Sequence, residues 1–199
     1  MLVIYGLGNN DKKYYNTKHN AGRFVLENLV ADLGLSFQKK LSFSYAKTAI
    51  QNQEVYFLYS NGFMNNSGIP LTSMCKYFKL DFASDVSNLV ILQDDSDQQE
   101  LKTKLVQAGG SAGHHGINSV YKQVLSLRIP MDRIWKLKIG IRPLENHSKS
   151  ETFVLKNLNQ KELTFLQNLA TQLNSFLPQW VEGSFDSSQS VLNQSLTLG

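Results

Sequence analysis

A histidine and an asparagine lie in a polar stretch near the start of the chain, where a strand pattern gives way to a helix pattern. Residues 2–5 form a short apolar run typical of a buried strand, and helical spacing of apolar residues begins at Ala21. The polar stretch between them puts Asn9 at the carboxyl end of the strand and His19 near the start of the helix. Open α/β sheets bind ligands at this edge. The unperturbed pKa of histidine suits His19 to accept a proton near neutral pH, although a lone histidine is more often a surface or helix-start residue.

Three carboxylates follow the apolar run at residues 89–92, which is typical of a central strand buried on both faces. They are Asp94, Asp95 and Asp97. A divalent metal site, a partner for a catalytic histidine and a solvated turn all fit this run, and a turn is its commonest fate. A dedicated calcium loop would spread its ligands over a longer segment closed by a glutamate, and the run lacks that pattern.

The glycine-rich segment at residues 109–116 contains two adjacent histidines, His114 and His115. Its glycines permit positive φ and a close approach of the backbone to a ligand. Histidines that bind one metal from a helix lie at i and i+4, so this adjacent pair does not predict a zinc site.

A cofactor site is the first hypothesis to test at Gly6-Leu7-Gly8, which begins a dinucleotide-binding fingerprint. The third glycine of that fingerprint would fall at Asp11, and the polar stretch that follows is too long for its tight turn. We therefore expect neither a nicotinamide nor a flavin cofactor.

Alternating strand and helix patterns predict the elements that must position these residues. We expect helices at residues 20–33, 71–78, 117–124 and from 159 onward, and strands at 43–50, 54–59, 101–106 and 135–141. With no internal repeat or linker, the chain is predicted to form one α/β domain over residues 1–182. Residues 183–199 are rich in Ser, Gln and Asn, and we expect them to form a loosely held polar tail.

Charge is unevenly distributed along the 199 residues, whose formal net charge is +4. Residues 81–100 contain six acidic residues and no Lys or Arg, whereas residues 102–142 contain eight basic residues and one acid. This asymmetry indicates a polyanionic partner beside a reactive centre, although an unevenly charged solvated surface would look the same. The single Cys75 fits a reducing compartment, and we expect no secretory signal or membrane span.

Taken together, several segments resemble the bacterial-type peptidyl-tRNA hydrolases, in the order in which that family carries them. They are residues 6–9 (GLGN), 17–22 (TKHNAG) and 63–68 (FMNNSG), then Asp94, 113–116 (GHHG) and 137–141 (LKIGI). The resemblance implies a mixed, twisted sheet flanked by helices, a three-layer architecture like that of phosphorylases and hydrolases. It also implies hydrolysis of the ester between peptide and tRNA, with no cofactor and no metal. We expect a monomer in the cytoplasm, or in the mitochondrial matrix if the source is eukaryotic.

The resemblance implies four catalytic residues, namely His19, Asp94, Asn9 and Asn65. In ester hydrolysis His19 would act as the general base on water, and Asp94 would accept the other imidazole N–H. Asn65 would donate to the oxyanion or position the water, and Asn9 would donate to the first peptide carbonyl. We expect water to attack the ester directly, without a covalent intermediate on the protein.

Substrate and tRNA contacts are also implied, at Tyr14, Phe63, Met64, Asn65, His115, Lys104 and Lys138. The chain departs from the family at Asn10, Asn66, Gln93 and His115, which replace Pro, Leu, His and Asn. Val106 stands where the family has a second lysine of its phosphate clamp.

Two alternatives remain open. One is an RNA-binding relative with an eroded active site, similar to the plant organellar splicing relatives of this family, and the departures at Gln93 and His115 motivate it. The other is a nucleoside or small-ester hydrolase on a similar α/β scaffold, which the basic balance of residues 102–142 disfavours.

Overall fold

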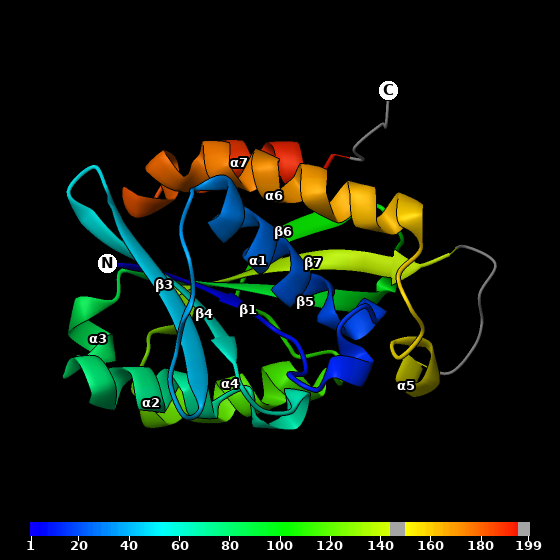
Figure 1. Ribbon diagram of the computed structural model, residues 1–199. Coiled ribbons are helices and arrows are strands. Elements are labelled where there is room, and N and C mark those ends of the chain that lie inside the picture. The colour runs from blue at the N-terminus through cyan, green and yellow to red at the C-terminus, as the bar shows by residue number, and fades with distance from the viewer. Residues whose placement is uncertain (144–149, 195–199) are drawn as a thin grey trace.

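Four parallel strands form the centre of a seven-stranded mixed sheet, in the computed structural model that describes residues 1–143 and 150–194 (Figure 1). The strand order is β2-β3-β4-β1-β5-β7-β6, and the pairs β2/β3, β3/β4 and β6/β7 are antiparallel. The strands are β1 (Leu2–Gly6), β2 (Gln38–Lys39), β3 (Phe43–Ile50), β4 (Gln53–Ser60), β5 (Asn88–Gln99), β6 (Thr103–Gln107) and β7 (Ile134–Arg142).

Helices cover both faces of the sheet, which gives the three predicted layers. Figure 1 shows α1, α6 and α7 on one face and α2, α3 and α4 on the other. The α-helices are α1 (Ala21–Asp32), α2 (Ile69–Phe78), α3 (Phe82–Asp85), α4 (His115–Ser126), α5 (Ser150–Phe153), α6 (Gln160–Val181) and α7 (Asp186–Leu192). The 3₁₀ helices are η1 (Lys12–Tyr14), η2 (Lys18–Asn20), η3 (Met64–Asn66) and η4 (Met131–Arg133). No helix in the described parts of the chain is long and apolar enough to cross a membrane.

The point where the strand order reverses lies at β1, because β1 pairs with β4 on one side and with β5 on the other. Connections leave the carboxyl ends of such strands in opposite directions, and the resulting crevice is where open α/β sheets bind ligands. Asn9 follows β1, and Asp94 lies in β5. The fold therefore places both predicted residues at this crevice.

Strand β5 is much longer than the apolar run at residues 89–92 predicts. It continues through the acidic run to Gln99, because Asp94 and Asp95 pair in register with Ile139 and Gly140 of β7. Any side chain at Gly140 would collide with the backbone, since a Cβ there would lie 1.9 Å from the carbonyl oxygen of Gln99. The solvated-turn interpretation is therefore wrong, because ladder bonds to the neighbouring strand outweigh the polarity of the run.

The tail from Gly183 is also better ordered than its composition predicts. Helix α7 packs on β6, where Thr103 Oγ1 donates to the carbonyl of Leu192 (2.6 Å). The Asn193 amide accepts from the N–H of Leu105 (2.7 Å) and donates to its carbonyl (3.3 Å), as a neighbouring strand would. The expectation of a loosely held tail is therefore wrong for α7, because a few buried apolar residues cover the exposed edge of β6. Residues 195–199 lie outside the described part of the chain.

Candidate active site

His19 lies in η2, which leads directly into α1. Its backbone N–H donates to the carbonyl of Val154 (2.8 Å), and the N–H of Lys18 donates to the carbonyl of Lys156 (2.9 Å). The Lys18 ammonium also forms a buried ion pair with Glu162, in the first turn of α6. These bonds hold the segment ahead of α1 against a distant part of the chain, which fixes where the imidazole of His19 can point.

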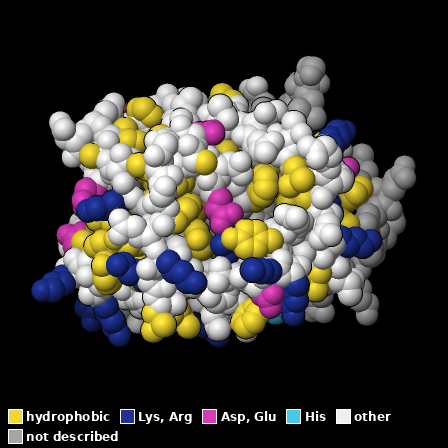
Figure 2. Space-filling model, viewed as in Figure 1, with side chains coloured by type: hydrophobic (Ala, Val, Ile, Leu, Met, Phe, Trp, Pro, Cys, Tyr) yellow, Lys and Arg dark blue, Asp and Glu magenta, His cyan; other side chains and the backbone are white. Residues whose placement is uncertain are grey.

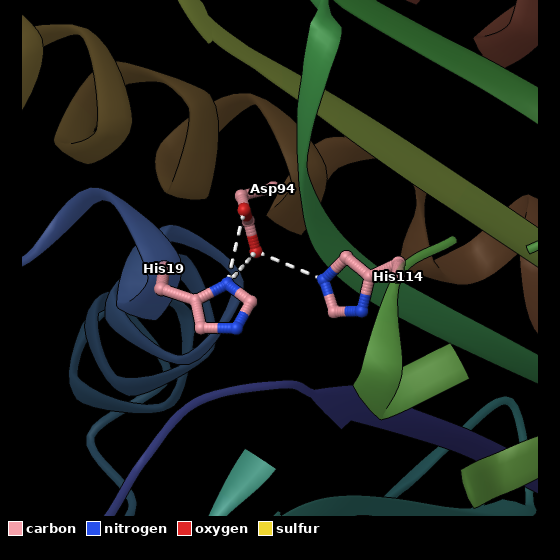
Figure 3. Close-up of side chains that lie close together, drawn as sticks. All are labelled: His19, Asp94 and His114. Atoms are coloured by element: carbon pink, nitrogen blue, oxygen red, sulfur yellow. Dashed lines mark hydrogen bonds and ion pairs between the residues drawn. The ribbon is translucent and has the colours of Figure 1, made fainter. Parts of the chain in front are cut away.

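Asp94 is buried at the centre of the site, and His19 approaches it from one side (Figure 3). The Nδ1 atom of His19 lies 2.9 Å from Oδ1 and 3.1 Å from Oδ2 of this carboxylate. Because an ionised carboxylate can only accept, Nδ1 carries the proton and Nε2 keeps its lone pair in the neutral ring. Figure 3 shows this second nitrogen pointing away from Asp94. The pair therefore presents a proton acceptor to whatever lies beyond Nε2.

Charge and hydrogen bonding shift the pKa values of both partners. Burial by itself lowers the pKa of His19, but the nearby Asp94 carboxylate raises it above the ordinary value of 6.5. Burial by itself raises the pKa of Asp94, but the two neighbouring imidazoles hold it well below the ordinary value of 3.8. Asp94 is thus ionised at neutral pH, and His19 retains its proton to a higher pH than a free histidine.

His114 approaches Asp94 from the other side, as the N-cap residue of α4. Its Nδ1 accepts from the backbone N–H groups of Gly116 (3.1 Å) and Ile117 (3.3 Å), and its Nε2 lies 3.0 Å from Oδ1 of Asp94. A nitrogen that accepts two N–H bonds carries no proton, so Nε2 is the protonated atom and donates to the carboxylate. A Cβ at Gly116 would lie 2.5 Å from Met64 Sδ, so a larger residue here would require Met64 to shift. The local backbone therefore fixes His114 as one neutral tautomer.

The three side chains line a pocket of about 260 Å³. Its other lining residues are Gln93, Asp95, Ser96, Asp97, Ser111, Ala112, Gly113, His115 and Val154. This described lining is rich in carboxylates and contains no Lys or Arg. A phosphate would be repelled here, whereas a neutral ester would not, so any phosphate contacts must lie outside the pocket.

Asn9 connects the first strand to the loop after β4. Its Oδ1 accepts from the backbone N–H of Met64 (2.8 Å), and its own N–H donates to Oδ1 of Asn20 (2.8 Å). The side-chain amide of Asn20 also donates to the carbonyl of Asn9 (2.9 Å). With its oxygen occupied by Met64, Asn9 can offer only its NH₂ group, which has no partner among the described residues.

The other predicted substrate residues lie apart from the Asp94 cluster. Asn65 and Phe63 are exposed, Tyr14 is half-buried and Met64 is buried, and none of them lines the pocket. His115, the first residue of α4, is exposed and does line it. The structure therefore brings together His19 and Asp94 directly, and Asn9 only as a neighbour of His19 through Asn20.

Lys104 and Lys138 lie directly opposite each other in the antiparallel pair β6/β7, so their side chains share one face of the sheet. Lys104 is exposed, and Lys138 Nζ donates to Oδ2 of Asp95 (2.8 Å). Both lysines line a second hollow of about 510 Å³, together with Lys102 and Asn193. The two lysines thus share one face of the sheet, beside the carboxylates of Asp95 and Asp97.

Residues 3–197 match the family model described as Peptidyl-tRNA hydrolase. The chain belongs to the peptidyl-tRNA hydrolase family. A curated family member from Mesoplasma florum is 30% identical over 92% of this chain and 95% of its own length. One from Mycoplasma capricolum subsp. capricolum is 31% identical over 89% of this chain and 91% of its own length.

Solved structures share the fold. The crystal structure of peptidyl-tRNA hydrolase from Acinetobacter baumannii superposes with a TM-score of 0.81 at 22% identity, covering 98% of this chain and 95% of that one. A methylthioadenosine/S-adenosylhomocysteine nucleosidase from Campylobacter jejuni reaches a TM-score of 0.52 at 9% identity, covering 89% and 98%. These likenesses concern the fold alone. The predicted family and the predicted α/β fold class are both confirmed.

His19, Asp94 and His114 also place one ligand atom each within 4.8 Å of one another, a grouping that could hold a metal ion. The hydrogen bonds of His114 argue against that use. A metal would need the lone pair of Nε2, which moves the proton to Nδ1, where it would face the N–H groups of Gly116 and Ile117. The donor set therefore fits a hydrogen-bonded network better than a metal site.

His114 is the residue of this network that the sequence analysis missed. The family resemblance instead predicted its neighbour His115, which replaces the family asparagine, as a substrate contact. The available signal was the position of His114 at a helix start, since a histidine that caps a helix through Nδ1 must present Nε2 elsewhere. Nothing in the sequence indicated that Nε2 would meet Asp94.

Proposed function

We propose that this chain hydrolyses the ester bond between peptide and tRNA in peptidyl-tRNA, as the name of its family implies. One observation carries the proposal: His19 is bonded to the buried Asp94 through Nδ1 and keeps Nε2 for a water molecule at the pocket. General-base catalysis of this kind contributes on the order of 10²–10⁴-fold to a rate.

In the proposed reaction, Nε2 of His19 takes a proton from water, and the water oxygen attacks the ester carbonyl carbon. The resulting imidazolium is stabilised by the ionised Asp94, which stays unprotonated. When the tetrahedral intermediate collapses, the bond to the terminal ribose oxygen breaks, and that oxygen takes the proton from His19. The products are a peptide with a free carboxyl group and a tRNA with a free ribose hydroxyl.

Asn65 is proposed as the donor to the developing oxyanion. It directly follows Met64, whose N–H is held by Asn9, so its backbone position is tied to the crevice. Its side chain is exposed and can turn toward a bound ester. Phe63, Tyr14 and His115 are proposed as further substrate contacts around the same opening.

Asn9 is proposed to recognise the first peptide bond of the substrate. Its NH₂ group would donate to the peptide carbonyl, which an ordinary aminoacyl-tRNA lacks. Because its Oδ1 is occupied by Met64, the orientation of this donor is fixed. A site built around such a bond leaves a polar group unpaired when the partner is absent, which gives discrimination.

Lys104 and Lys138 are proposed to bind tRNA phosphates outside the acidic pocket. Both lie on one face of β6/β7, and their hollow adjoins the pocket of His19, with which it shares Asp95 and Asp97. Figure 2, in the view of Figure 1, shows Lys and Arg mostly in the lower half and only scattered charged side chains in the upper half. We propose that the protein acts in the cytoplasm. We also propose that it is a monomer, and sedimentation of the purified chain tests this oligomeric state.

Turnover of N-acetyl-aminoacyl-tRNA by the purified chain tests the function. We expect release of free tRNA and N-acetyl-amino acid, and lower rates with unblocked aminoacyl-tRNA. Tight tRNA binding without turnover would instead favour the RNA-binding alternative. The intact contacts of His19, Asp94 and His114 argue against that alternative, because an eroded site has no need for them.

A further inference from the structure

The loop between β6 and α4 places His114 next to Asp94. Its backbone adopts conformations that its own residues do not favour. Ala108, Gly109, Ala112 and Gly113 all have positive φ, between 48° and 83°. Two of these residues are alanines, for which the left-handed region is unfavourable. Backbone bonds close the loop near its two ends, from Ala108 N–H to the carbonyl of Ile134 and from His114 N–H to the carbonyl of Ser111.

A buried lysine holds the middle of this loop. Lys136, in β7, is 1% exposed, and its Nζ donates to the carbonyls of Gly110 (2.6 Å) and Gly109 (3.2 Å). The hydroxyl of Tyr121, in α4, donates to the same Gly109 carbonyl (2.7 Å). Two carbonyls of the loop are thus bound to side chains from the sheet and from the helix that His114 caps.

The surroundings of Lys136 make this contact unusual for an ammonium group. No carboxylate forms an ion pair with it among the described residues, and the Tyr121 ring lies 5.5 Å from Nζ. Burial and the charge of Lys138 lower its pKa to about 8, with Asp95 acting in the opposite direction. Lys104, across the strand pair, lines a further hollow together with Lys136 and Lys138 and adds positive charge there. Burying the Lys136 ammonium without a carboxylate partner is unfavourable, so its hydrogen bonds to the loop carbonyls must be strong.

We propose that Lys136 is a positioning residue of the active site, which holds the loop at residues 108–113 in the shape that brings His114 Nε2 onto Asp94. The role in catalysis rests on the proposed function, whereas the effect on His114 is a property of the folded chain alone. Lys136 does not touch the reacting atoms. It acts through His114, which in turn holds the Asp94 carboxylate toward His19.

Imidazole NMR of the parent chain and of Lys136→Met tests the structural step. The chain has four histidines, so their ring signals can be resolved. In the parent we expect His114 in the tautomer with the proton on Nε2. In Lys136→Met we expect the tautomer to persist, because Gly116 and Ile117 still hold Nδ1. The Nε2 and Nε2–H shifts of His114 should move, because the loop no longer holds the ring on Asp94 and the bond to the carboxylate is weakened. Unchanged His114 shifts in a folded Lys136→Met protein would overturn the proposal.

Kinetics test whether the contact matters for turnover. Misplacement of a group in an active site lowers the rate, so we expect Lys136→Met to lower kcat by up to about tenfold, no more than His114→Ala, with little change in KM. Tyr121→Phe should lower kcat in the same direction but less, since the lysine remains. Lys122→Met is the matched control, because it removes an exposed charge from α4, next to Tyr121, and should leave kcat unchanged.

A double variant separates positioning from a general loss of stability. If Lys136 acts through His114, the variant Lys136→Met/His114→Ala should have the same kcat as His114→Ala alone. Additive losses would overturn the proposal. Should the parent chain fail to hydrolyse peptidyl-tRNA, the proposed function fails, and the NMR comparison still decides the role of Lys136.

Discussion

Asp94 and Asp95 are neighbours in one strand, yet their carboxylates bind different partners. Successive side chains of a strand point to opposite faces. Asp94 is buried between His19 and His114 at the crevice, whereas Asp95 binds the lysine of the basic β6/β7 face. In the proposed reaction the first carboxylate stabilises the charge that forms on His19, whereas the second pairs with Lys138. The comparison teaches that changes around Asp94 should alter kcat, and changes around Asp95 should alter KM.

Removing the base should have the largest effect on the Asp94 side. We expect His19→Ala to lower kcat by about 10²–10⁴-fold or more, because no other described group takes the place of Nε2. The affinity for tRNA should be nearly unchanged, since the lysines lie elsewhere. Single-turnover hydrolysis and a filter-binding assay measure the two quantities. A variant that turns over at the parent rate would remove His19 from the mechanism.

Removing the second partner of Asp94 should have a smaller effect in the same direction. We expect His114→Ala to lower kcat by about tenfold, because Asp94 keeps its bond to His19 but loses the donor that orients it. KM should stay close to the parent value. Steady-state kinetics measure both constants, with circular dichroism as the check on folding. If KM rises and kcat is intact, His114 belongs to substrate binding and the comparison fails.

Replacing the two lysines on the face that contains Asp95 should change tRNA binding and leave the catalytic step unchanged. We expect the double variant Lys104→Met/Lys138→Met to raise KM by about tenfold and to leave kcat near the parent value, because phosphate contacts release counterions. The same variant should flatten the dependence of KM on salt concentration. A salt series of KM values for both proteins measures this. Equal salt slopes would show that these lysines only solubilise the sheet edge.

Asn9 should show the smallest effect, confined to substrate choice. We expect Asn9→Ala to narrow the ratio of kcat/KM for N-blocked over unblocked aminoacyl-tRNA by severalfold, chiefly by slowing the blocked substrate. Parallel assays with both substrates give this ratio. An unchanged ratio with both rates intact would assign Asn9 only to holding the Met64 backbone.

Sequence patterns predicted the fold well where local spacing carries the information. The buried strand at residues 2–5, the strands at 43–50 and 54–59 and the long helix that begins near residue 159 all appear as expected. Helix α7 escaped prediction, because its stability comes from Phe185 stacking on Trp135, with ring centroids 4.3 Å apart, and not from its polar composition.

The site was predictable only in part. The pattern around residues 94–97 could not tell which carboxylate meets a histidine, because that depends on which face of β5 each side chain occupies. The family resemblance selected Asp94, and the contact with His19 is confirmed. His114 and Lys136 were out of reach, since both act through contacts between segments far apart in the sequence.

The pH dependence of kcat/KM for the parent and for Asp94→Asn tests the central claim most directly. A general base must be unprotonated, so kcat/KM should rise with pH through the His19 pKa, which the carboxylate holds above 6.5 in the parent. Replacing Asp94 by Asn removes the charge that raises this pKa, so the acid limb should move to lower pH while the plateau falls. An acid limb with the same midpoint in both proteins would contradict the coupling of His19 to Asp94.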